Sequence, residues 1–158
     1  MKNLKFIPYE QVGDLIFGME REIVKEKCGH CLSSCMYGYP VEDRYLDDYG
    51  HMHTLCNNKQ RLEAIELFPD ISTEEFVLEY NGELIYLKKE VDALVQQLEK
   101  ITDDLTEDED EEGYSSLKLG LKVYCPEDIV EDVIIHDRYC YEEEQEYIRE
   151  QGLDIVQG

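Results

Sequence analysis

The sequence lacks several features that define common protein classes. It has no tryptophan and only 4 prolines among 158 residues, and its 15 basic residues face 38 acidic ones, which gives a net charge of −23. No apolar run is long enough to span a bilayer. The stretch 1–8 has two lysines but neither the apolar segment nor the cleavage site of a signal peptide, so we expect a cytoplasmic protein with reduced cysteines.

The scarcity of positive charge limits the choice of partner. A chain of this charge repels DNA, RNA and anionic membranes, and it attracts cationic proteins at rates that fall as salt rises. We therefore expect a protein partner, and neither a nucleic acid nor a membrane. Acidity can also serve solubility alone. The net charge therefore indicates that a partner would be positively charged, but it does not show that there is a partner.

What the chain does contain suits one folded domain over residues 1–158. Hydrophobic residues make up 42%, and 12 tyrosines add apolar area with a polar tip, a combination that is common at interfaces. Two helices are predicted, at 18–29 with Gly29 as its cap and at 88–101. Their apolar faces are Met19, Ile23, Val24 and Cys28 in the first, and Val91, Leu94, Val95, Leu98 and Ile101 in the second.

Strand patterns fill most of the remaining chain. Residues 4–17 read as extended. Two hairpins are predicted, one with its connection at 58–60 between strands at 51–57 and 61–68, and one with its turn at Asn81-Gly82 between strands at 76–80 and 83–87. Residues 116–125 alternate as one strand with Leu117, Leu119, Leu121, Val123 and Cys125 on one face, another strand lies within 127–138, and a terminal helix is expected at 141–151. The result is an α+β protein with a curved antiparallel sheet and two to three packed helices. A helix followed by a hairpin in each half gives a weak internal repetition.

The cysteines offer two candidate chemistries. Cys28 and Cys31 have the spacing of a thioredoxin-type centre, but the apolar periodicity places Cys28 at the C-terminal end of its helix, where the dipole disfavours a thiolate. The alternative is zinc, for which Cys28, Cys31, Cys35 and Cys56 supply four ligands with histidines 30, 51 and 53 nearby. Reduced, half-buried thiols are the simplest interpretation, so no cofactor is expected unless zinc is bound.

The acidic residues point to a surface rather than to catalysis. A carboxylate dyad needs two groups at a fixed separation with one pKa raised by burial, and the acids here are too abundant for any pair to stand out. Neither a glycine-rich phosphate loop nor a nucleophile-elbow serine is present, so we expect no enzyme activity. Residues 103–113 are so densely acidic that a solvated, disordered loop is predicted.

One resemblance covers most of the chain. Residues 17–24, followed by Cys28-Gly29, resemble the "fGMsreeVr..lG" opening of small bacterial proteins found among toxin-immunity systems. Similar segments follow at 47–49, 58–67, 80–84, 119–124 and 130–134, so the likeness runs from about residue 13 to 137. Gly29-His30-Cys31 departs from the "G.P" of that pattern. The matching residues form turns and packing contacts, so the resemblance concerns the fold more than the function.

The resemblance implies an immunity protein that binds and blocks a cognate bacterial toxin. Charge adds the expectation that the toxin is basic, for example a nuclease. The candidate partner-binding residues are acids of the run near 103–113 and residues close to the C-terminus: Glu107, Asp108, Glu109, Asp110, Tyr139, Tyr141 and Glu143. Two alternatives remain, a zinc-stabilised adaptor or regulatory protein and an acidic mimic of nucleic acid.

Overall fold

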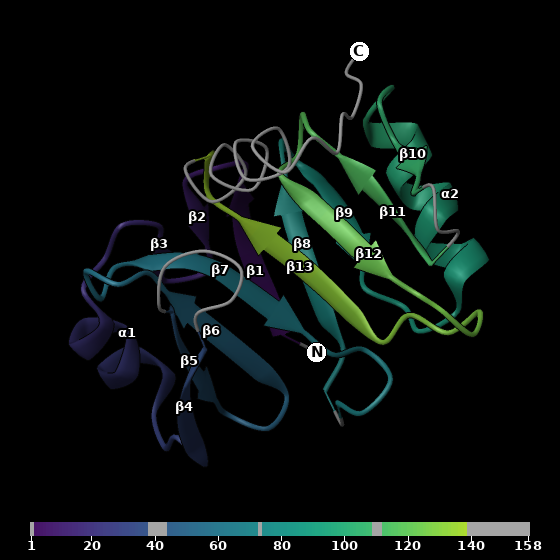
Figure 1. Cartoon of the computed structure of the whole chain (residues 1–158). Coiled ribbons are helices and arrows are strands. Elements are labelled where there is room, and N and C mark those ends of the chain that lie inside the picture. The colour runs from purple at the N-terminus through teal and green to yellow at the C-terminus, as the bar shows by residue number, and fades with distance from the viewer. Residues whose placement is uncertain (1, 38–43, 73, 109–111, 139–158) are drawn as a thin grey trace, which may run out of the picture.

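The computed structural model describes residues 2–37, 44–72, 74–108 and 112–138, which form two sheets and two helices (Figure 1). The smaller sheet contains β1 (Lys2–Ile7), β2 (Gln11–Val12), β3 (Leu15–Ile16), β8 (Phe76–Tyr80) and β9 (Glu83–Tyr86). The larger sheet contains β4 (Ser33–Tyr37), β5 (Arg44–Asp48), β6 (Met52–Cys56), β7 (Leu62–Leu67), β10 (Thr106–Glu107), β11 (Gly113–Ser116), β12 (Leu121–Tyr124) and β13 (Asp132–His136). The helices are α1 (Arg21–Cys28) and α2 (Val91–Ile101).

The strand order confirms the α+β class. The smaller sheet runs β3-β2-β1-β8-β9 and the larger one β10-β11-β12-β13-β7-β6-β5-β4, and both sheets are open. All neighbouring strands are antiparallel except β1 and β8, which are parallel. Because short connections join most sequential strands, the fold consists of hairpins and meanders rather than crossovers.

The two halves of the chain have the same topology. After β1, the order is hairpin β2–β3, helix α1 and meander β4–β7, and it then repeats as hairpin β8–β9, helix α2 and meander β10–β13. The smaller sheet is symmetrical about β1, and the larger sheet is symmetrical about the β7–β13 pair. The chain therefore contains two similar units related by an approximate two-fold axis, with β1 as an extra central strand.

Details of the backbone repeat between the two units, with a shift of 68 residues at the turn that precedes the last strand of each meander. Gln60 and Asp128 both have positive φ, at 58° and 64°, immediately before the last strand of each meander. In each unit the residue that precedes the helix bridges to the residue after this turn, Glu20 to Arg61 and Glu90 to Ile129. The helices correspond with a shift of 70. The weak repetition in the sequence is thus a complete structural one.

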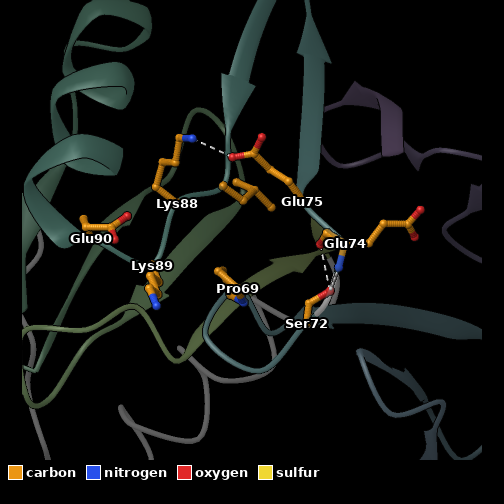
Figure 2. A pocket seen from close by; sticks show the side chains of 8 residues that line it. Pro69, Ser72, Glu74, Glu75, Lys88, Lys89 and Glu90 are labelled. Carbon is orange, nitrogen blue, oxygen red and sulfur yellow. Dashed lines mark hydrogen bonds and ion pairs between the residues drawn. The ribbon is translucent and has the colours of Figure 1, made fainter. Parts of the chain in front are cut away.

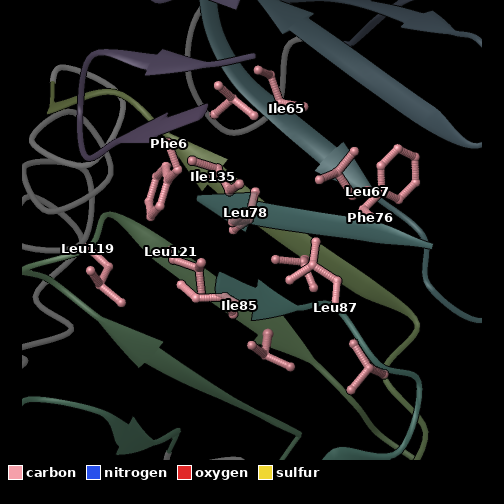
Figure 3. Close-up of a cluster of buried hydrophobic side chains, with 14 of the residues drawn as sticks. Phe6, Ile65, Leu67, Phe76, Leu78, Ile85, Leu87, Leu119, Leu121 and Ile135 are labelled. Carbon is pink, nitrogen blue, oxygen red and sulfur yellow. The ribbon is translucent and has the colours of Figure 1, made fainter. Parts of the chain in front are cut away.

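The hydrophobic core lies between the two sheets (Figure 3). Phe6, Leu78 and Ile85 reach it from the smaller sheet, and Ile65 and Ile135 from the larger one, all at most 2% exposed. Strand alternation directs every second side chain of β7, β12 and β13 to this layer. Both helices extend it, because Val24 of α1 and Leu94 and Leu98 of α2 are fully buried.

Most predicted elements are confirmed. Asn81 and Gly82 have φ of 48° and 79°, as a tight hairpin turn requires, and Gly29 ends α1 at φ 88°. The stripe on α2 faces the core as predicted, whereas Ile23 of α1 is 40% exposed and was wrongly assigned to the buried face. The predicted helix at 141–151 lies outside the described residues.

The prediction of one strand over 116–125 was wrong. A turn at residues 117–120 divides it into β11 and β12, with Gly120 at φ 62° and with Tyr9 3.0 Å from the place a Cβ would occupy. Leu117 is consequently 52% exposed, although Leu119, Leu121 and Val123 are buried. Alternation alone could not reveal this, because a turn that flips the chain can preserve the same apolar spacing.

Within the described part of the chain, neither helix combines the length and the apolar character needed to cross a bilayer.

Candidate functional site

The acidic candidates Glu107 and Asp108 lie at one edge of the larger sheet. Glu107 ends β10 and pairs with Tyr114 of β11, and the backbone N–H of Asp108 donates to the carbonyl of Gly113 at 2.8 Å. Glu107 is exposed, whereas Asp108 is half-buried and accepts a hydrogen bond from the Ser115 hydroxyl at 2.9 Å. The predicted loop 103–113 therefore includes a short edge strand.

Helix α2 adds two acids to this edge. Burial raises the pKa of Tyr114, and the negative charges of Glu107, Asp92 and Glu99 raise it further, so these three carboxylates act electrostatically on one tyrosine. Asp92 and Glu99 are exposed and seven residues apart, which places them on the same side of α2. We call Asp92, Glu99, Glu107 and Asp108 the acidic face.

Two acids of the same run serve the structure instead. Asp104 accepts hydrogen bonds from the Thr102 hydroxyl at 2.6 Å, the Ser116 hydroxyl at 2.5 Å and the Lys118 backbone N–H at 2.8 Å. Burial opposes ionisation, but these hydrogen bonds outweigh it and lower the pKa of Asp104. Asp103 pairs with the Lys118 ammonium at 2.5 Å. These two carboxylates hold the end of α2 against the β11–β12 turn.

The other predicted partner-binding residues, Glu109, Asp110, Tyr139, Tyr141 and Glu143, lie outside the described residues. Their part in a binding surface stays a prediction.

The four predicted zinc ligands do not share one face. Strand pairing sets Cys35 opposite Leu46 and Tyr45 opposite Cys56, so Cys35 and Cys56 project from opposite faces of the larger sheet. Cys28 is half-buried at the end of α1. In the part of the chain that the structure describes, no three His, Cys, Asp or Glu side chains are arranged to hold a metal. Zinc binding therefore stays a prediction for metal analysis.

The thiols near α1 are in environments that disfavour thiolate. Burial is the largest cause that raises the pKa of Cys28 to about 11 and that of Cys56 to about 12. Cys28 lies at the C-terminal end of α1, as predicted, where the helix dipole also opposes a negative charge. Both groups are protonated near neutral pH, so they lack the activation that thiol–disulfide catalysis needs.

Sequence reasoning missed a buried charged network under α1. The Arg21 guanidinium binds Asp47 of β5 through two hydrogen bonds, at 2.9 Å and 2.8 Å, and lies 4.8 Å from the Tyr45 ring. The Ser34 hydroxyl donates to the same carboxylate at 2.6 Å, and Asp47 is fully buried. Burial opposes the charge, but these partners lower the pKa of Asp47. Nothing in the local pattern distinguishes Asp47 from the exposed acids.

A second polar cluster lies on the outer face of the larger sheet. His53 of β6 is 3.1 Å from Glu66 of β7 and 3.4 Å from Asp48 of β5. Burial, together with a hydrogen bond and the negative charge of Glu66, raises the pKa of Asp132 in β13 to about 9. Its Oδ1 atom is buried without a hydrogen-bond partner among the described residues. Asp132 and Glu66 are thus two neighbouring carboxyl groups, and ionisation of one opposes ionisation of the other.

Three of the pockets lined by described residues lie near these groups. The pocket in Figure 2 has a volume of about 280 Å³ and lies where the β7–β8 connection meets the segment before α2, with Lys88 paired to Glu75 at 2.7 Å. A pocket of about 440 Å³ lies beside Lys100 and Lys118, next to Glu99 of the acidic face. The third, of about 290 Å³, lies between Tyr124 and Asp132 on the outer face.

Comparison with known proteins adds no relative: neither a family model, nor a curated protein, nor a solved structure matches the chain. The function is therefore inferred from the residues and their arrangement alone.

Proposed function

We propose that this chain is an immunity-type protein that binds a cationic protein toxin and blocks it. The second structural unit, with its acidic face, supplies the binding surface. The protein acts as a stoichiometric inhibitor and not as a catalyst.

The observation that carries the proposal is the unequal charge of two units with one topology. Residues 1–68 contain 8 basic and 11 acidic side chains, a net charge of −3, whereas residues 69–138 contain 6 and 21, a net charge of −15. If acidity served only solubility, the two units would have little reason to differ so much. A concentration of one sign on one side of the molecule instead suits electrostatic steering of an oppositely charged partner.

The arrangement of the acids supports binding rather than internal stabilisation. Asp103 and Asp104 are engaged with Lys118 and with neighbouring hydroxyls, whereas Asp92, Glu99 and Glu107 are exposed. Burial raises the pKa of Tyr114 and the charges of these three raise it further, so like charges gather near one tyrosine, with the mutual repulsion that this implies. Basic side chains of a partner would relieve it, and Tyr114 would add a contact with both apolar and polar parts.

The direct test uses the product of the neighbouring gene that carries a toxic domain, which the proposal requires. Binding of the purified proteins is measured by calorimetry between 50 and 300 mM NaCl, and protection is measured by co-expression in a sensitive strain. We expect one-to-one binding that weakens as salt rises, because counterions screen attraction between exposed charges. Absence of binding to the neighbouring toxin, at any of these salt concentrations, contradicts the proposal.

Matched variants locate the surface. Asp92→Asn with Glu99→Gln removes two charges from α2, and Glu22→Gln with Glu26→Gln removes two from the corresponding helix α1. We expect the α2 variant to bind about three- to tenfold more weakly and the α1 variant to bind as the parent does. Equal effects from the two variants would mean that total charge, and not the acidic face, drives binding.

A further inference from the structure

The pocket on the outer face of the larger sheet is built from three segments that are distant in sequence. Phe68 and Ile71 come from the connection between β7 and β8, Tyr124 ends β12, and Asp132 begins β13 directly opposite Tyr124. The remaining lining residues are Asp70 and Glu131. Aromatic and aliphatic side chains and carboxyl groups thus line the same pocket.

The charge of this pocket distinguishes it from the other two. The pocket of Figure 2 includes Lys88 and Lys89 among its acids, and the pocket beside α2 includes Lys100 and Lys118. The third pocket has three acidic residues and no basic one in its described lining. Its carboxyl groups therefore lack the cation that each of the other pockets supplies internally.

The walls are unusually apolar for an exposed acidic surface. Ile71 is 66% exposed and Tyr124 is 40% exposed, and Phe68 is held in place by the His53 ring, 4.6 Å away. Isolated exposed apolar side chains are common, but here they stand around one hollow. At about 290 Å³ the hollow is at the lower limit for a small-molecule site and suits a single side chain.

We propose that this pocket receives an arginine side chain of a protein partner, whose apolar stem and guanidinium lie against Phe68, Ile71 and Tyr124 and whose charge is met by the exposed carboxylates of Asp70 and Glu131. This inference rests on the proposed function and names one anchoring contact within it. A guanidinium stacks on aromatic faces and forms two parallel hydrogen bonds with carboxylates, which a lysine ammonium does not. Buried arginines are also common hot spots of interfaces.

The buried Oδ1 atom of Asp132 supports the same occupant. An orphaned carboxyl oxygen between strands costs free energy in the isolated protein, and a cation bound at the mouth of the pocket would offset part of that cost. The pocket adjoins the β7–β13 pair at the centre of the larger sheet, so it is held by the rigid part of the fold.

The test uses Nα-acetyl-arginine N-methylamide as a probe of the full chain, followed by two-dimensional amide NMR. We expect saturable shifts centred on Ile71, Tyr124 and Asp132, with a dissociation constant on the order of 1–10 mM. The corresponding citrulline amide, which has the same shape without the charge, should give no saturable shifts, and the lysine amide should bind more weakly. Shifts spread evenly over the acidic face, or equal shifts with citrulline, would overturn the proposal.

Substitutions at exposed positions test the pocket without disturbing the folded structure. Asp70→Asn with Glu131→Gln should weaken probe binding about three- to tenfold, and Tyr124→Leu should weaken it while retaining apolar area. Glu22→Gln with Glu26→Gln is the matched control, since it removes the same charge from exposed positions of α1 that do not line this pocket, and it should leave binding unchanged. If the control weakens binding equally, the pocket has no specific role.

The two proposals can fail separately. A toxin that binds while the arginine probe does not would retain the proposed function and remove this pocket from it. A probe that binds while no neighbouring toxin does would retain the pocket and remove the immunity function.

Discussion

The two units of this protein attach their helices with different chemistry. In the first, the charged Arg21 of α1 binds the buried Asp47 of the larger sheet. In the second, Gln97 of α2 accepts a hydrogen bond from the backbone N–H of Tyr86 and donates one to its carbonyl, both at 2.8 Å. β9 is an edge strand, so Gln97 satisfies groups that the edge leaves unpaired.

The surfaces differ as strongly as the attachments. The first unit is close to neutral and the second carries most of the negative charge of the described chain. The buried apolar positions nevertheless correspond, with Val24 matching Leu94 in the helices. The two units thus share their packing positions, whereas their polar contacts and their surface charge differ. These differences predict that matched substitutions in the two units have unequal effects.

Asp47→Ala should cause the largest loss. It leaves the Arg21 guanidinium and the Ser34 hydroxyl without their buried partner, which costs about 3–5 kcal/mol in the free energy of unfolding. Ser115→Ala changes the corresponding position of the second unit and should cost about 1 kcal/mol or less. Urea unfolding followed by circular dichroism measures both. Similar losses would show that the two units are attached equally.

Leu98→Ala should be the next largest. Leu98 is fully buried on α2, and loss of its side chain leaves a cavity that costs about 3 kcal/mol. Cys28 occupies the corresponding place in α1 but is half-buried, so Cys28→Ala should cost about 1 kcal/mol. The same unfolding experiment compares the two. A larger loss of unfolding free energy for Cys28→Ala than for Leu98→Ala would contradict the interpretation that α2 is packed more deeply than α1.

Asp132→Asn should change how stability depends on pH. Because the pKa of Asp132 is raised to about 9 in the folded state, the folded protein binds more protons than the unfolded chain between about pH 4 and pH 9. The contribution of Asp132 is therefore fully present below pH 4 and is lost as the pH rises toward 9. We therefore compare the free energy of unfolding of the variant with that of the parent at each pH. Between pH 4 and pH 9 this difference should move by about 1–2 kcal/mol in favour of the variant. An unchanged pH profile would contradict the raised pKa.

Neutralising exposed acids should have the smallest effect. Glu99→Gln with Glu107→Gln relieves repulsion in the acidic face and should raise Tm by about 1 °C at low salt, with no gain at high salt. Glu22→Gln with Glu26→Gln should give no such gain, because α1 also carries Arg21, Lys25 and Lys27. Calorimetric scans at 20 and 500 mM NaCl distinguish the two. Equal gains would mean that the repulsion is not confined to the second unit.

Part of the candidate site could be predicted from the sequence. The density of acids near residue 107 predicted a solvated, negatively charged segment, because solvated charge is a property of composition, but it did not predict the edge strand β10. The pocket between Tyr124 and Asp132 could not be predicted, since its residues come from separate segments and meet only through strand pairing. The same limit hid Asp104, whose role depends on Ser116 and Lys118.

The sequence by itself determined the α+β class, the sign of the charge, the hairpin at Asn81-Gly82 and the helix stripe from Val91 to Ile101. These features depend on local periodicity and turn chemistry, which a short window of sequence contains. Only the tertiary structure decided the two-fold arrangement of the units, the turn that divides β11 from β12, the burial of Asp47 and the pairing of Asp132 with Glu66. Those outcomes depend on which distant strands pair and which side chains they bring together, and a carboxylate has the same local signature whether it ends in water or beside an arginine.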